Sequence, residues 1–166
     1  MKTMLTILTA GFACIVSAPA AETAKPLVTL TVKKHVLDRE HDQRGLRGSS
    51  TQKSLTLRVE IVNTSPAAIE GAELSGHALI MRAGDFREML IKEFLGTIKV
   101  PAMKPNEKLT LELGKIDLRE MEWRARKFEE SLEEWRVVCT RGGVEIAKAE
   151  SSDKYTSLEK DAKQPV

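Results

Sequence analysis

Residues 54–62 read SLTLRVEIV and carry the strongest structural signal in this 166-residue chain. Aliphatic side chains occupy every second position and polar side chains fill the positions between: Leu55, Leu57, Val59 and Ile61 against Thr56, Arg58 and Glu60. Alternation with a period of two predicts a β-strand with one buried face. The sequence NTSP at 63–66 ends this strand, because proline cannot donate to a ladder and asparagine tolerates turn geometry.

Weaker forms of the same alternation recur along the chain. We expect further strands over 27–37, 74–81, 89–100, 109–113, 135–140 and 144–149. Gly76 indicates a bulge inside one of them, and Arg141-Gly142-Gly143 predicts a hairpin between the last two. About seven short strands with turns between them predict an all-β, two-layer sandwich.

Two segments do not follow this pattern clearly. Residues 41–53 hold two glycines and two serines without periodicity, which predicts a mobile loop. Residues 117–134 are rich in helix formers, with apolar residues at helical spacing: Leu118, Met121, Ala125, Phe128 and Leu132. Met121, Trp123 and Ala125 also alternate, so a short helical or irregular insertion and an edge strand both stay open.

The N-terminus has the three regions of a secretory signal peptide, over residues 1–21. Lys2 provides the positive charge, residues 4–16 are apolar, and small residues at 17–20 predict cleavage after Ala20 or Ala21. The apolar run is too short to span a bilayer, so we expect no stable membrane insertion after cleavage. The remaining chain is expected to be exported to the periplasm, the outer surface or the medium. It divides into one domain, 22–150, and a loose polar tail, 151–166, anchored by Tyr155 and Leu158.

Composition and motifs exclude several classes of chemistry. Lys plus Arg number 26 and Asp plus Glu 24, and this near-neutral balance argues against a dedicated nucleic-acid binder. No phosphate-binding glycine loop, dinucleotide fingerprint or nucleophile elbow occurs. The densest group of potential metal ligands matches no established spacing: His35, Asp38, Glu40, His41 and Asp42. Cys139 reads as a buried apolar thiol. We therefore predict a protein that is not an enzyme and holds no metal or cofactor.

Two short segments are the best candidates for binding a partner. The 39–53 segment is basic, and loops at one end of a sandwich often carry recognition. Residues 123–127 combine a tryptophan with three cations, which suits an anionic or sugar ligand, although the flanking glutamates also fit a surface laced with ion pairs. The predicted partner-binding residues are Arg39, Arg44, Arg47, Trp123 and Arg124.

The segments LTLRVEIVNTSP (55–66) and IKVPAMKPNEKLTLELG (98–114) resemble bacterial immunoglobulin-like domains of the cell-adhesion-related type. The chain as a whole is similar to small secreted immunoglobulin-like proteins associated with type IV pili, although the disulfide of that fold is missing. The resemblance implies a role in surface assembly or adhesion, with other envelope or surface proteins as partners. Two further readings stay open. One is a small-ligand or protein-inhibitor module that uses the 39–53 segment, and the other is an unrecognised hydrolase.

Overall fold

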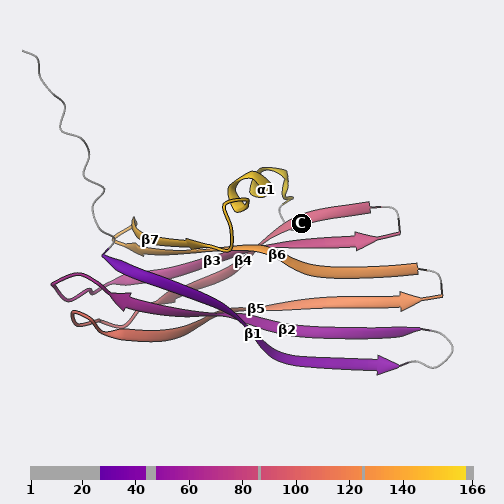
Figure 1. The fold of residues 1–166 in the computed structure, drawn as a ribbon, viewed down its shortest axis with the longest axis horizontal. Coiled ribbons are helices and arrows are strands. Elements are labelled where there is room, and N and C mark those ends of the chain that lie inside the picture. Colours follow the sequence, from indigo (N-terminus) through magenta and orange to yellow (C-terminus); the bar gives the residue numbers. More distant parts are fainter. Residues whose placement is uncertain (1–26, 44–47, 86, 125, 164–166) are drawn as a thin grey trace, which may run out of the picture.

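The computed structural model describes residues 27–43, 48–85, 87–124 and 126–163. These form seven antiparallel strands and one short helix: β1 (Val28–Gln43), β2 (Ser49–Asn63), β3 (Ala72–Gly84), β4 (Arg87–Lys99), β5 (Lys108–Trp123), β6 (Arg126–Arg141), β7 (Val144–Glu150) and α1 (Tyr155–Asp161). The strands make one sheet in the order β1-β2-β5-β6-β3-β4, with β7 also beside β6 (Figure 1). The all-β prediction is confirmed. The expected signal peptide at 1–21 lies outside the described residues.

Strand β6 divides the sheet into two parts because it changes partner along one edge. Residues 126–129 of β6 pair with β5, whereas residues 136–141 pair with β7. Beyond this fork β5 separates from β6, and the strands at that end form two stacked layers (Figure 1). β1 then lies near β7 and β4 near β5, so the layers approach each other along both margins. We call this part the sandwich half.

The sandwich half holds the main hydrophobic core. The predicted inward face of β2 is fully buried, with Leu57, Val59 and Ile61 all 0% exposed. Trp135, Val137 and Cys139 of β6 pack into the same cluster. The layers touch closely at two glycines: a Cβ on Gly76 would lie 2.2 Å from Leu113 Cδ2, and one on Gly114 would lie 2.6 Å from the Leu95 carbonyl oxygen. Gly76 also marks the expected bulge, at a register shift between β3 and β4.

The other ends of six strands continue as a flat sheet (Figure 1, right). We call it the single-layer half and define it by the segments 37–43, 49–53, 82–84, 87–89, 119–123 and 126–130. None of its described residues is buried as a whole, and its most covered charged side chain, Glu130, lies against Arg82. The same strands therefore pass from a two-layer sandwich into a sheet whose two faces are both accessible.

The structure corrects two of the sequence predictions. Residues 41–43 and 49–53 are not a loop, because they extend β1 and β2 into a long hairpin. Residues 117–134 are not a helix: they form the end of β5, a turn at Arg124 with φ 56°, and the start of β6. The alternation of Met121 and Trp123 was the correct signal, since β2 hydrogen-bonds residues 116–122 on one side and β6 pairs with 120–123 on the other.

The C-terminal segment is not a loose tail. Helix α1 packs on β3, β4 and β6, and Tyr155 is fully buried beside Leu79 and Leu90. The predicted anchors are confirmed, because Leu158 packs against the same cluster. After the helix, Lys163 forms a parallel bridge to Ile91 and covers a short part of the β4 edge.

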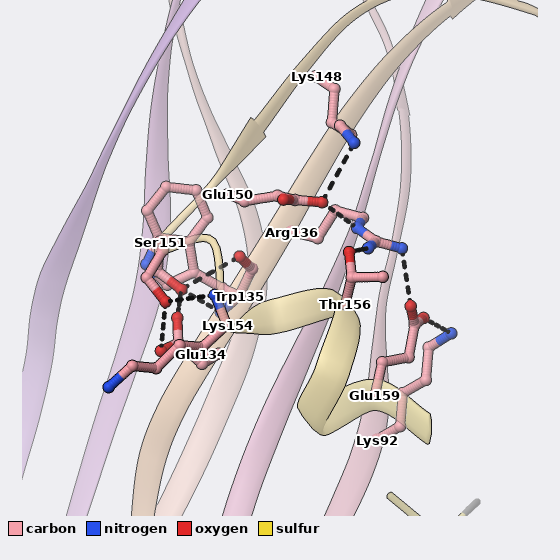
Figure 2. A network of polar contacts seen from close by, with 11 residues as sticks. Lys92, Glu134, Trp135, Arg136, Lys148, Glu150, Ser151, Lys154, Thr156 and Glu159 are labelled. Carbon is pink, nitrogen blue, oxygen red and sulfur yellow. Dashed lines mark hydrogen bonds and ion pairs between the residues drawn. The ribbon is translucent and has the colours of Figure 1, made fainter. Parts of the chain in front are cut away.

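A polar network attaches the helix to the sheet (Figure 2). The Arg136 guanidinium contacts Glu150 at 2.7 Å and Glu159 at 2.8 Å, and it lies 4.1 Å from the centre of the Tyr155 ring. Lys92 of β4 contacts Glu159 at 2.5 Å. Burial raises the pKa of Glu159, but the hydrogen bond from Lys92 and the charge of Arg136 outweigh burial, so the pKa is lower than usual. The network thus holds the Glu159 carboxylate ionised.

Candidate interaction surface

The structure places three of the five predicted partner-binding residues at the same end of the sheet. Arg39 lies on β1, Trp123 ends β5, and Arg124 forms the turn into β6. They come together because β2 runs between β1 and β5, with Ser49 opposite both Gln43 and Glu122. Arg44 and Arg47 lie outside the described residues. All three located residues belong to the single-layer half or its turn.

The single-layer half has two faces of different chemistry, because side chains alternate along each strand. One face, which we call the Trp123 face, is formed by the side chains on the same side of the sheet as Trp123. These are residues 38, 40 and 42 of β1, residues 50 and 52 of β2, residues 119, 121 and 123 of β5, residues 126, 128 and 130 of β6, residues 82 and 84 of β3, and residues 87 and 89 of β4. The His41 face carries the residues between them. Arg39 therefore points to the opposite side of the sheet from Trp123.

The Trp123 face has an apolar centre. Met121 and Phe128 are directly paired across β5 and β6, and Phe128 lies over Gly84 of β3. Trp123 is 62% exposed, and Met121 and Met89 are also exposed. Large apolar side chains gathered on an accessible face are typical of binding surfaces.

Charges flank this apolar centre unevenly. Three arginines lie on the side of β3, β4 and β6, and line a shallow hollow with Phe128 and Met89: Arg82, Arg87 and Arg126. Arg82 contacts Glu130 at 2.6 Å, and Arg126 contacts Asp85 at 3.4 Å. On the opposite side, β1 presents three acidic residues: Asp38, Glu40 and Asp42. The face is therefore acidic along one margin and mainly basic along the other.

The His41 face leads into a cavity of about 340 Å³ at the fork between β5 and β6. Arg39, Lys53 and Lys34 line it together with Glu120, Glu129 and Leu118. Lys34 Nζ donates to the Leu132 carbonyl oxygen at 3.5 Å, close to where β6 has left β5. Nearby, His41 Nδ1 and Thr51 Oγ1 lie 2.9 Å apart across β1 and β2. The cavity is a charged wedge between the diverging layers.

Chemically reactive groups do not gather at either face. Burial raises the pKa of Cys139 to about 11, so its thiol stays protonated inside the sandwich half. Across the described residues, no three His, Cys, Asp or Glu side chains form a group able to hold a metal ion. Asp117 is a carboxylate whose pKa is lowered by hydrogen bonds from Ser54 and Lys115. No described helix is long and apolar enough to cross a membrane.

Sequence reasoning missed the apolar centre of the Trp123 face. Phe128 had been assigned to a helical core stripe, and Met89 to a strand without a stated role. The available signal was the alternation of Met121 with Trp123, which places both on one face of a strand. Met121 and Trp123 lie on the same face as Phe128 and Met89 because of the order of the strands in the sheet, and no local sequence pattern predicts that order.

No protein-family model matches the chain, and no curated protein matches it. Among solved structures, a protein from Akkermansia muciniphila is similar with a TM-score of 0.35 and 12% identity, over 86% of this chain and 83% of the other. A target of the Northeast Structural Genomics Consortium is similar with a TM-score of 0.30 and 11% identity, over 75% of this chain and 85% of the other. Likenesses of this degree carry no argument about function.

Proposed function

We propose that this chain is a non-catalytic, exported interaction protein that binds a protein partner through its single-layer half. It would contribute to a surface assembly or to adhesion, as the immunoglobulin-like resemblance of its sequence implies. The observation that carries the proposal is the apolar centre of the Trp123 face, formed by Met89, Met121, Trp123 and Phe128 on a part of the sheet that no described segment covers. Tryptophan and arginine, which meet here, are the residues most enriched at the energetic centres of interfaces.

The form of the single-layer half supports this role. A sheet that extends beyond its core contributes little burial to stability, so its length needs another explanation. With about 4.8 Å between strands and about 3.3 Å per residue, six strand segments that average about five residues give each face roughly 450 Å². An area of this order fits a modest protein interface better than a small-molecule site.

The test is an affinity pull-down from native cell-envelope extract, read by mass spectrometry. The bait is the wild-type chain, and the disrupting variant carries Met121→Ala and Trp123→Ala. The matched control is Val144→Ala, because Val144 is 66% exposed on the β6–β7 hairpin at the sandwich end. We expect envelope proteins to be enriched by the wild type and the control, and lost with the double variant. A blank with wild-type bait would contradict the proposal.

Export needs its own test, because it rests on the sequence of residues 1–21 alone. We expect a C-terminally tagged chain to be recovered outside the cytoplasm, with a mature N-terminus at Ala21 or Glu22. Cell fractionation followed by N-terminal mass spectrometry measures both. Recovery of the full-length chain in the cytoplasm would contradict export.

A second candidate function is supported by the wedge cavity. Its volume of about 340 Å³ lies at the lower end of the range for small-molecule sites. Four cations line the cavity against three carboxylates, and three of the cations, Lys34, Arg39 and Lys53, lie on the β1–β2 side, where an anionic ligand would bind. Calorimetric screening of anionic sugars and carboxylates, with Arg39→Ala and Lys53→Ala as the disrupting variant, tests it. Unchanged weak binding in that variant would exclude the cavity.

A further inference from the structure

The strongest unexplained feature of the single-layer half is the order of chemistry across the Trp123 face. One row of neighbouring residues crosses all six strands, through register pairs except at the step from β6 to β3, where Phe128 lies over Gly84: Asp42, Ser50, Met121, Phe128, Gly84 and Arg87. In chemical terms this row runs acid, small, large apolar, large apolar, small, base. If this row is laid over a reversed copy of itself, the acid faces the base, each small residue faces a small residue, and each large apolar residue faces a large apolar residue.

We infer that the Trp123 face binds a second copy of this chain. The two copies would lie face to face around a two-fold axis that runs parallel to the strands, between β5 and β6. The inference rests on the proposed function, because it names the partner of the same surface. A two-fold interface needs a surface that is complementary to itself, and the six-strand order provides one.

The symmetry fixes which strands meet. Two strands lie on each side of the β5–β6 pair, so the axis places β1 of one copy over β4 of the other, β2 over β3, and β5 over β6. Asp42 then faces the Arg87 of the second copy, and Met121 faces its Phe128. An axis perpendicular to the strands would instead place the acidic β1 margins over each other. Charge therefore selects the first arrangement.

The four inner positions of the next row support the same arrangement. The row contains Glu40, Gln52, Arg119, Glu130, Arg82 and Met89. Around the same axis, Arg119 of one copy faces Glu130 of the other, and Gln52 faces Arg82. Glu130 already binds Arg82 within its own chain, so the second copy would extend an existing ion pair into a network.

The available area indicates a weak dimer. Two faces of roughly 450 Å² bury about 900 Å² in total, which is slightly below the roughly 1,000 Å² that a stable specific interface buries. We therefore expect a dissociation constant in the micromolar range. Because charged residues line the outer strands of the face, we expect self-association to weaken as the salt concentration rises.

The test is analytical ultracentrifugation of the purified chain over a range of concentrations, with two charge reversals. Asp42→Arg places like charges opposite Arg87, and Arg87→Asp places like charges opposite Asp42. We expect each variant alone to raise the dissociation constant at least tenfold. In an equimolar mixture of the two variants both contacts are complementary again, so we expect dimers to return.

Two reversals at the sandwich end serve as controls: Glu145→Arg and Arg141→Asp, at exposed residues of the β6–β7 hairpin. We expect them to leave self-association unchanged, and circular dichroism to show that all variants are folded. A monomer at every concentration would overturn the inference. So would dimers that Asp42→Arg and Arg87→Asp affect no more than the controls do.

Ultracentrifugation and the pull-down described above together separate the inference from the proposed function. If the chain is monomeric yet the Trp123 face captures an envelope protein, the proposed function stands and the self-association is overturned. If the chain dimerises as expected but nothing else is captured, the inference stands without an assembly role.

Discussion

Strand β2 is buried at one end and accessible at the other, although both ends are equally regular strand. Leu55, Leu57 and Val59 lie under a second layer, whereas Thr51 and Lys53 line the open cavity where the two layers diverge. The sandwich half gains its stability from buried apolar area. The single-layer half depends on backbone ladders and cross-strand pairs, such as His41 with Thr51. Regular strand structure therefore does not require a core beneath every residue.

The largest expected effect comes from the close contact between the layers. Gly114 has φ +63°, and an added Cβ would lie 2.6 Å from the Leu95 carbonyl oxygen. Gly114→Ala combines a strained backbone with overpacking, so we expect it to lower the free energy of unfolding by about 3–5 kcal/mol. Gly96→Ala is the control, since φ is +101° there but nothing lies within 4 Å. Urea unfolding measures both, and equal losses would show that the contact is not important.

A matched pair of leucines compares the two halves directly. Leu57 is 0% exposed in the sandwich half and Leu37 is 46% exposed in the single-layer half. We expect Leu57→Ala to cost about 3 kcal/mol, because it leaves a cavity, and Leu37→Ala to cost about 0.5 kcal/mol or less. Thermal unfolding followed by circular dichroism distinguishes them. A large loss at Leu37 would mean that the single-layer half is covered in solution.

The attachment of α1 predicts a pH dependence. The pKa of Glu159 is lowered in the folded chain, so its contribution to stability is complete above the ordinary value of 4.5 and is lost as the pH falls through the lower folded value. We expect Glu159→Gln to cost about 1 kcal/mol at pH 7. The difference from wild type should shrink in acid.

Urea unfolding at several pH values measures this difference. Glu145→Gln is the control, because Glu145 is an exposed carboxylate without an ion pair among the described residues. A pH-independent difference for Glu159→Gln would contradict the role of its charge.

The smallest expected effects concern two cross-strand ion pairs. Arg58 and Glu112 lie on the outer side of the sandwich half, with side chains 44% and 48% exposed, whereas Glu130 beside Arg82 is only 8% exposed. We expect coupling energies of about 0.3 kcal/mol for the first pair and about 1 kcal/mol for the second. Double-mutant cycles with alanine, at concentrations where the chain is monomeric, give both values. A stronger Arg58–Glu112 pair would reverse this expected order.

Local patterns predicted the sandwich half better than the single-layer half, for a physical reason. Residues 54–62 alternate because one face is buried, and burial is what an amphipathic pattern records. Residues 49–53 have no buried face, so they show no pattern and resembled a loop. Residues 117–134 resembled a helix because an exposed strand accepts the same charged residues that helices favour. The sequence predicts Tyr155 and Leu158 as anchors, but it does not predict the helix that contains them.

The candidate surface was only partly predictable. Trp123 and Arg124 stand out as an exposed aromatic beside a cation, and Arg39 belongs to a visibly basic segment. Their gathering at one end follows from non-local pairing, since β2 joins residues far apart in the sequence. Met89 and Phe128 carry no local sign of exposure, because an apolar residue in a strand is normally assigned to the core.

The order of the strands also has a consequence for the rate of folding. β1–β2, β3–β4, β5–β6 and β6–β7 are hairpins between neighbours in sequence, but β2 must find β5 and β3 must find β6. The Ser54–Asp117 contact alone closes a loop of 63 residues. Closing such a long loop costs chain entropy before the paired strands make any stabilising contacts. We therefore expect the hairpins to form early and the sheet to assemble in milliseconds to seconds. During that interval the edges of β2 and β3 stand open, and the chain is at its most vulnerable to mispairing.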